Sequence, residues 1–436
     1  MSRFVKLSEE VVASIISNLS RDEKSLSNLC LVGNRIVLAI ARSYLCKEAN
    51  VHVNFDDQSD PYSLSVFVTD ELHARSVVSV KFIFSGIFDN EKSNTSVLQK
   101  SLQKLTSLKH AHLSFFRMRE KSRDSNAPIL LEILLQSLPN LTSIYVEGYD
   151  PARNLTTPIK LHQLKALVVR YSNPILSHIW TSAPGLEVIE MLGGSSSGYY
   201  VTIDAENLYT GYTGSMVGTK YVFEDSGTLV KTGYFDHLKR LYVGSDLSGN
   251  LHDDVEAIIH FFRRFPNSLP FLEELVLFFH FSVEDYTTIL RAVAGPQLKR
   301  LRLGLSPFLT QIADRNSIFH YSSPQWDKCT SLKELWLPIA GPESLKEIGL
   351  LQPAMNILTH LYFEHPFRDR DEFVKNQEEL VKLLSSCAPL LEIVSWDNGD
   401  VFGIIREDSE VKLVSKQTYV KPKWQRFASS VKWWDS

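Results

Sequence analysis

The stretch Leu298-Lys-Arg-Leu301-Arg-Leu303 carries the pattern that decides the fold. In it a leucine is followed by two free positions, an apolar residue, one free position and another apolar residue. Such recurrence predicts a repeat architecture, because one unit of this kind cannot bury its apolar face without a neighbour. The ten copies of the phrase begin at Leu108, Leu141, Leu164, Leu186, Leu238, Leu272, Leu298, Leu332, Leu358 and Leu391.

Amphipathic helices are expected between the copies. Apolar residues three and four positions apart predict helices over residues 129–138, 253–264, 284–294 and 371–386. In five copies a proline stands two residues before the first leucine, where its missing N–H would end the preceding helix. These prolines are Pro139, Pro184, Pro270, Pro296 and Pro389. Strands that alternate with helices predict a parallel sheet with right-handed crossovers, and solenoids of this kind generally bind other proteins.

The spacing of the copies is irregular at one place. The phrases start 22 to 34 residues apart, except that 52 residues separate Leu186 from Leu238. This interval holds either a degenerate repeat or an insertion, and its composition favours an insertion. Residues 193–234 contain eight of the 20 glycines and six of the 16 tyrosines of the chain. A mix of Tyr, Gly and Ser adapts well to partner surfaces, but a loop without a role would have the same composition.

Composition limits the class of protein. Of the 436 residues, 44% are hydrophobic and 22% are charged, which is typical of a folded chain. The formal net charge of -4 gives no reason to expect a nucleic-acid or membrane partner. No signal-peptide core and no apolar run of about 18 residues occurs. The cysteines, which have neither zinc-ligand spacing nor a disulfide pattern, are Cys30, Cys46, Cys329 and Cys387. An intracellular location, cytoplasmic or nuclear, is expected.

The first 55 residues differ from the rest of the chain. Apolar residues at helical spacing follow Ser8, a suitable N-cap, and two further apolar stretches lead into an alternating strand at residues 51–55. We therefore expect a small helical module at 1–55 and a connector at 56–76. The repeat solenoid should occupy 77–420, with the insertion near 193–234. Residues 421–436 are aromatic and predict either a cap on the last repeat or a docking tail.

Two resemblances to known families cover nearly the whole chain. The phrase Leu7-Ser8-Glu9-Glu10-Val11-Val12-Ala13-Ser14-Ile15-Ile16-Ser17-Asn18-Leu19 resembles the opening of an F-box, and the match continues to Leu45 much as in fungal F-box proteins. Ser8 replaces the proline of that family, and Ile36 replaces its usual large aromatic residue. The phrases that follow resemble leucine-rich repeats, most closely at Cys387-Ala-Pro389-Leu-Leu391.

These resemblances imply a fold and a function. The fold would be α/β, with a helical F-box-like module followed by a curved leucine-rich-repeat solenoid built on a parallel β-sheet. The protein would recruit a substrate protein to a Skp–cullin–F-box ubiquitin ligase. The residues that match the family's contacts to the Skp-family adaptor are Leu7, Ser8, Val11, Ile15, Ile16, Leu19 and Val32. Val12 and Leu29 are expected in the core of the module itself. The alternative is a leucine-rich-repeat scaffold without a role in ubiquitin transfer.

The free third and fifth positions of the phrase predict a surface. In a strand they point to the face opposite the leucines, and neighbouring strands lie about 4.8 Å apart, so equivalent positions form rows across the sheet. The third-position row is Arg240, Glu274, Arg300, Glu334 and His360. The fifth-position row is Tyr242, Val276, Arg302, Trp336 and Tyr362. Opposite charges should therefore lie side by side, and Arg302 should stack on Trp336.

Two interpretations of these rows remain open. An exposed group of Trp, Arg and Tyr has the composition of a binding hot spot, which predicts a substrate-binding surface. The residues of that predicted surface are Tyr242, Arg300, Arg302, Trp336 and Tyr362. Alternatively, the charges only neutralise each other and the aromatic residues only cover the sheet.

Motifs for catalysis or for cofactor binding were not found. His360 and His365 flank Glu364 at a spacing that does not fit the helical zinc motif. The glycine-rich segment 193–198 lacks the lysine of a phosphate-binding loop. Residues 194–198 have Gly-x-Ser-x-Gly spacing, but no expected helix follows them as in a nucleophile elbow, and no cysteine lies in a recognisable nucleophile context. The expectation is a protein that is not an enzyme and needs no cofactor or metal.

Overall fold

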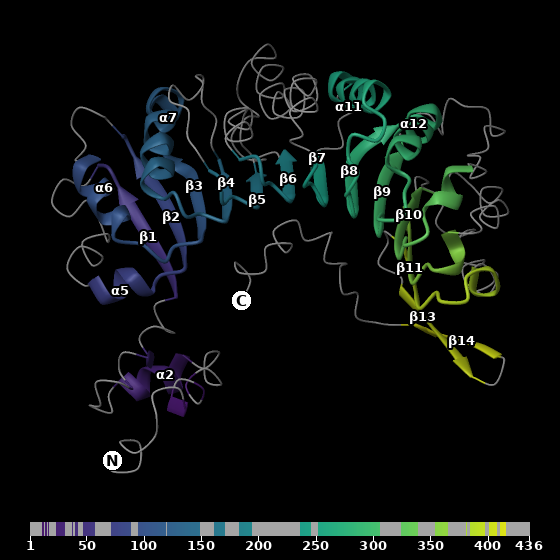
Figure 1. Ribbon diagram of the computed structural model, residues 1–436, viewed down its shortest axis with the longest axis horizontal. Coiled ribbons are helices and arrows are strands. Elements are labelled where there is room, and N and C mark those ends of the chain that lie inside the picture. Colours follow the sequence, from purple (N-terminus) through teal and green to yellow (C-terminus); the bar gives the residue numbers. More distant parts are fainter. Residues whose placement is uncertain are drawn as a thin grey trace. The chain divides into compact units, whose positions relative to one another are not determined.

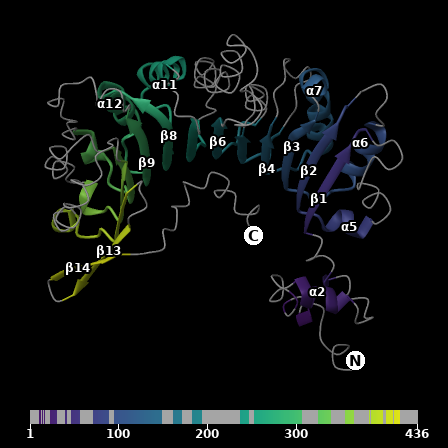
Figure 2. The ribbon, with the colours of Figure 1, turned by 180° about the vertical axis from the view of Figure 1, so that it is seen from behind.

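The chain forms two compact units, Met1–Gly185 and Leu186–Ser436. Figures 1 and 2 show them in a computed structural model from opposite sides. The structure describes residues 11, 12, 14, 16, 23–30, 37, 40, 41, 47–56, 71–88, 95–118, 120–148, 161–170, 183–193, 236–245, 252–305, 324–338, 354–364, 381, 384–396, 401–407 and 410–415. The predicted insertion beyond Gly193 and the aromatic segment 421–436 lie outside these residues.

The amino-terminal part of the first unit is helical where it is described. Helix α2 spans Glu23–Cys30, and residues 11, 12, 14, 16, 37, 40 and 41 are also helical. These stretches share a core in which Leu29 and Ile40 are partly buried. The buried members of this core are Val12, Ile16, Leu26, Val37 and Ala41. Val12 and Leu29 thus lie where the sequence predicted them, in the module's own core.

The rest of the first unit is a parallel sheet. Its strands pair in chain order: β1 (Glu48–Asn54), β2 (Ser79–Gly86), β3 (His110–Met118), β4 (Ser143–Glu147) and β5 (Ala166–Arg170). The helices between them are α5 (Glu71–Ser76), α6 (Thr95–Gln103) and α7 (Glu120–Ser137).

Strand β1 extends the sheet beyond the predicted start of the solenoid. The sequence analysis assigned residues 51–55 to the helical module and began the solenoid at residue 77. In the structure Val51 and Val53 of β1 are buried, and β1 pairs in parallel with β2 along its whole length. The sheet therefore begins at Glu48, and the expected connector 56–76 is a crossover between two of its strands. The repeat phrase could not reveal this coil, because β1 does not carry it.

The second unit continues the same plan. Its parallel strands are β6 (Val188–Gly193), β7 (Arg240–Ser245), β8 (Glu274–Phe281), β9 (Arg300–Leu305), β10 (Glu334–Pro338), β11 (His360–Glu364) and β12 (Ile393–Trp396). Strand β6 pairs directly with β7, so the 52-residue interval places no additional strand between them. The described connections include α11 (His252–Arg264), α12 (Val283–Val293) and the 3-10 helices η2 (Pro324–Lys328) and η4 (Ala354–Asn356).

The predicted helices occur where they are described. Residues 129–138 fall almost entirely within α7, 253–264 within α11, and 284–294 on α12 and its C-cap. Of the predicted helix 371–386, the structure describes Val381 and residues 384–386, and these are helical. Ser282 caps α12: its hydroxyl accepts from the backbone N–H of Asp285, whose carboxylate accepts from the Ser282 N–H. Such a capping box satisfies two backbone donors at the start of the helix.

The leucines of the phrase form the core of both units. All ten opening leucines, from Leu108 to Leu391, are buried, as are the apolar residues three positions after them. Backbone hydrogen bonds link the residues that follow the opening leucines of neighbouring coils. For example, the N–H of Lys299 donates to the carbonyl of Glu273 at 2.7 Å. Helices α11 and α12 pack against β8, and α12 also packs against β9. Each unit is therefore leucine-rich-repeat-like: parallel coils in one register around a leucine core.

The carboxyl end of the second unit departs from the parallel plan. Strands β13 (Val401–Glu407) and β14 (Glu410–Ser415) form a hairpin that pairs antiparallel to β12. The guanidinium of Arg406 donates to the carbonyl of Leu391 at 2.8 Å and to that of Ala388 at 2.9 Å. One side chain thus joins the hairpin to the turn that precedes β12.

Candidate functional site

The predicted rows exist in the second unit. Register pairs place Arg240, Glu274, Arg300, Glu334 and His360 side by side, and do the same for Tyr242, Val276, Arg302, Trp336 and Tyr362. We call the surface made by these ten residues the ladder face. Because each strand starts at the same position of the phrase, one register carries both rows across five strands. All five predicted substrate-binding residues lie on this face.

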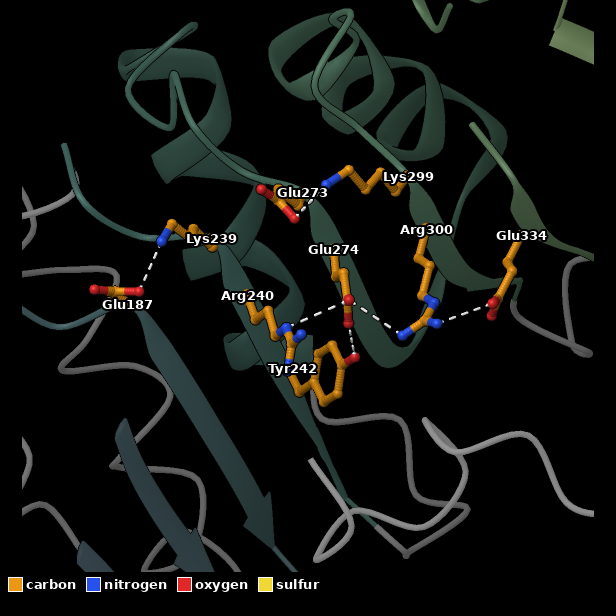
Figure 3. A network of polar contacts seen from close by, with 9 residues as sticks. All are labelled: Glu187, Lys239, Arg240, Tyr242, Glu273, Glu274, Lys299, Arg300 and Glu334. Carbon is orange, nitrogen blue, oxygen red and sulfur yellow. Dashed lines mark hydrogen bonds and ion pairs between the residues drawn. The ribbon is translucent and has the colours of Figure 1, made fainter. Parts of the chain in front are cut away.

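Charged residues of the third-position row form a continuous network, which Figure 3 shows. Glu274 is buried at its centre and accepts from Arg240 at 3.3 Å and from Arg300 at 3.1 Å. Arg300 also contacts Glu334 at 3.0 Å. The hydroxyl of Tyr242 donates to the second carboxylate oxygen of Glu274. The predicted alternation of charge is therefore confirmed, and Glu274 joins two of the predicted binding residues, Tyr242 and Arg300.

The network shifts the ionisation of its members. Burial alone would lower the pKa of Arg300, but Glu274 and Glu334 outweigh it and hold that pKa above its ordinary value. Burial raises the pKa of Tyr242, and the charge of Glu274 raises it further. Arg300 is therefore charged and Tyr242 is neutral over the whole physiological range, so Tyr242 serves Glu274 as a hydrogen-bond donor.

A second group on the ladder face is aromatic. The guanidinium carbon of Arg302 lies 3.8 Å from the ring centroid of Trp336, which confirms the predicted stacking. The rings of Trp336 and Tyr362 are stacked with centroids 5.8 Å apart. Contacts of this kind each contribute about 0.5–2 kcal/mol. The three side chains thus form a row across β9, β10 and β11.

The predicted exposure of the aromatic residues is wrong. Tyr242 is 2%, Trp336 3% and Tyr362 6% exposed, and together with buried Val276 they form an apolar cluster. A strand spacing of about 4.8 Å brings large side chains into contact along a row. The phrase specifies which face a residue points to, but it contains no information about what lies over that face.

A buried carboxyl group extends the fifth-position row by one strand. Glu190 of β6 is in register with Tyr242, is 0% exposed, and neither of its oxygens has a hydrogen-bond partner. Burial raises the pKa of Glu190 well above its ordinary value; Arg240 opposes this shift and Glu274 adds to it. The sequence analysis missed Glu190 because the long interval after Leu186 concealed that β6 and β7 are neighbours. Its place in the phrase was the signal that could have found it.

The predicted adaptor-binding residues are only partly described. Val11 is exposed on the helical module. Ile16, in contrast, was predicted to contact the adaptor, but its side chain is 1% exposed and lies in the module's own core. It lies four residues after buried Val12 and therefore on the same side of the helix. The side chains of Leu7, Ser8, Ile15, Leu19 and Val32 lie outside the described residues.

The corresponding face of the first unit carries a histidine pair that the sequence analysis did not single out. Nε2 of His112 lies 2.9 Å from a carboxylate oxygen of Glu147 on the next strand, and Nδ1 of His110 lies 2.8 Å from the hydroxyl of Ser143. Burial lowers the pKa of both histidines below the ordinary value of 6.5. Burial alone would raise the pKa of Glu147, but hydrogen bonds and the charges of His112 and Lys81 outweigh it and lower that pKa.

Acid should therefore destabilise the first unit. A histidine whose pKa is depressed by folding contributes stability that is fully present above pH 6.5 and is lost as the pH falls through the lower folded value. The free energy of unfolding should thus decrease from pH 7.5 to pH 5, measured by urea denaturation. His112→Gln should make this decrease shallower, whereas His162→Gln, at an exposed position, should leave it unchanged. If the free energy of unfolding decreased equally with pH in the unmodified protein and in both variants, His112 would not be the source of the acid sensitivity.

Other kinds of site are not apparent in the described part of the chain. Among those residues no group of three or more His, Cys, Asp or Glu side chains is arranged to hold a metal ion. Within the same residues, no helix has both the length and the apolar character required to cross a membrane.

Comparison with known proteins does not identify a family for this chain. No protein-family model and no curated protein matches the sequence. Among solved structures, the chain is similar to TLR13 as seen in the crystal structure of a TLR13–ssRNA13 complex, with 13% sequence identity and a TM-score of 0.32. The match covers 75% of this chain and 45% of that chain, so this protein spans less than half the length of that neighbour. The repeat-like fold therefore rests on the register and the leucine core described above.

Proposed function

We propose that this chain is a protein-binding scaffold that presents the ladder face to a client protein. The observation that supports this most is the row of Arg302, Trp336 and Tyr362, held in one register by three parallel strands. Tryptophan, tyrosine and arginine are the residues that contribute most to binding energy in protein interfaces. Because the row is buried, a client would bind it by displacing whatever lies over it.

We further propose that the helical module attaches this scaffold to a Skp-family adaptor of a cullin-based ubiquitin ligase. The support is the F-box-like phrase at residues 7–19 together with the exposed side chain of Val11 on a helical segment. The buried cluster around Val12 and Leu26 gives this small module its own core. An exposed apolar side chain outside that core suits a groove on a partner.

Affinity purification of the full chain tests the client-binding part. Arg302→Ala combined with Trp336→Ala should reduce the recovery of client proteins at least about tenfold, because hot-spot residues carry most of the binding energy. Phe271→Ala is the matched control, since it removes an exposed aromatic residue from the turn before β8. Both proteins should retain the adaptor equally. Client recovery that is the same in both variants would contradict a role for the ladder face.

The ubiquitin part has a separate test. Val11→Glu should abolish recovery of a Skp-family adaptor and of the cullin, because a charge would enter an apolar contact. Ser27→Glu places the same charge on an exposed position of α2 and should have no effect. If the unmodified chain recovers clients but neither adaptor nor cullin, the ubiquitin part is wrong and a scaffold outside ubiquitin transfer remains.

A further inference from the structure

A buried carboxyl group lies beside the ladder face, on strand β6. Glu190 is 0% exposed, and among the described residues neither of its carboxyl oxygens has a hydrogen-bond partner. An ionised carboxylate that is buried without hydrogen bonds is much less stable than the neutral acid, so such a group keeps its proton instead. The position of Glu190 in the fold therefore favours its neutral form.

The polar side chains on the neighbouring strand already serve another carboxylate. Glu190 is in register with Tyr242 of β7, whose hydroxyl donates to Glu274 of β8. Arg240, which is also on β7, contacts Glu274 at 3.3 Å. Glu274 thus receives a hydrogen bond from one of these side chains and an ion pair from the other, as Figure 3 shows, and neither of them hydrogen-bonds to Glu190.

The charges on the described strands next to Glu190 oppose each other. Arg240 of β7 favours the ionised form of Glu190, whereas Glu274 of β8 disfavours it. Tyr242 supplies no positive charge, because it is neutral. Burial outweighs the attraction of Arg240, and together with Glu274 it holds the pKa of Glu190 well above the ordinary value of 4.5. The electrostatics therefore agree with the burial and the lack of hydrogen bonds.

We infer that Glu190 is a neutral carboxylic acid in the folded chain, and that loss of its proton destabilises the β6–β7 end of the second unit. When the pH rises, the proton passes to solvent and a negative charge remains in a buried place. This charge is repelled by Glu274, and Arg240 then has two carboxylates to neutralise instead of one. The inference goes beyond the proposed function and holds whether or not a client binds the ladder face.

Infrared spectroscopy of the full chain tests the protonation state directly. A protonated carboxyl group has a C=O stretching band that an ionised carboxylate lacks. The unmodified protein should show this band at pH 7, and its intensity should fall by that of one carboxyl group in Glu190→Gln. Glu256→Gln, at an exposed position of α11, should leave the band unchanged. The inference is overturned if the band is equally strong in the unmodified protein and in Glu190→Gln.

The pH dependence of unfolding tests the consequence. A carboxyl group whose pKa is raised by folding contributes stability that is fully present below its unfolded value, near 4.5, and is lost as the pH rises through the folded value. From pH 5 to pH 8 the unfolding constant of the unmodified protein should therefore rise relative to that of Glu190→Gln, by up to about tenfold for each pH unit. Urea denaturation combined with hydrogen exchange of β6 and β7 measures both constants.

The same measurements separate a neutral Glu190 from an ionised one. Glutamine has the shape and the neutrality of the protonated acid, so Glu190→Gln should fold at pH 7. If a cationic group neutralised an ionised Glu190, the variant would instead be less stable than the unmodified protein at every pH in this range. That result, a variant that does not fold, or a ratio of unfolding constants that does not change with pH would each refute the inference. Glu256→Gln should give a constant ratio to the unmodified protein.

Discussion

Leu275→Ala should lower the free energy of unfolding of the second unit by about 2–5 kcal/mol. Leu275 is fully buried in the middle of β8 and is in register with Leu241 and Leu301 on the neighbouring strands. Truncation leaves a cavity in the leucine core, and each coil depends on contact with its neighbours. Urea denaturation combined with amide hydrogen exchange of β7, β8 and β9 measures the loss.

Phe271→Ala provides the control for this substitution. Phe271 lies only four residues earlier but is 57% exposed, so its loss should change the free energy of unfolding by no more than about 0.5 kcal/mol. If Leu275→Ala changed the free energy of unfolding as little as Phe271→Ala, the buried leucines would not stabilise the coils. The leucine-rich-repeat-like architecture would then be wrong.

Glu274→Ala should cost about 3–5 kcal/mol, although it removes a charged residue from a sheet face. The carboxylate of Glu274 is buried and is shared by Arg240, Arg300 and Tyr242. Its removal leaves two guanidinium groups near each other without their common partner. Urea denaturation measures the effect, and increased hydrogen exchange should be confined to β7, β8 and β9.

The neighbouring residue is a matched control. Glu273 pairs with Lys299 at 2.7 Å, but both side chains are substantially exposed. Exposed ion pairs contribute about 0–1 kcal/mol, so Glu273→Ala should be nearly neutral. Equal losses for Glu273→Ala and Glu274→Ala would show that the network in Figure 3 gains nothing from burial.

The repeat phrase was sufficient to predict the parallel sheet and both rows of the ladder face. A single register explains this success, because the position of a residue in its phrase determines its strand neighbours. The stacking of Arg302 on Trp336 follows from this rule alone. Burial of the same residues could not be predicted, because the phrase contains no information about what lies over that face.

The phrase could not place strands that lack it in the sheet: β1 was expected only as an alternating strand at residues 51–55 of the helical module. Strand β1 contains Val51 and Val53 but no leucine phrase, and its place in the sheet depends on pairing with β2. The hairpin of β13 and β14 has no phrase either. Glu190 has the phrase but was separated from its neighbour by the long interval. In each case the missing information was a contact between residues distant in the sequence.

The hairpin at the carboxyl end also limits how the molecule can associate. The backbone donors and acceptors on the outer side of β12 are used by β13, whose direction is opposite to that of β12. A further parallel coil, whether from this chain or from a second copy, cannot join the array at β12 in the register of its predecessors. The hairpin therefore ends the parallel array, and among the described strands it makes β14, which can accept only a strand that continues its own register, the edge of the sheet.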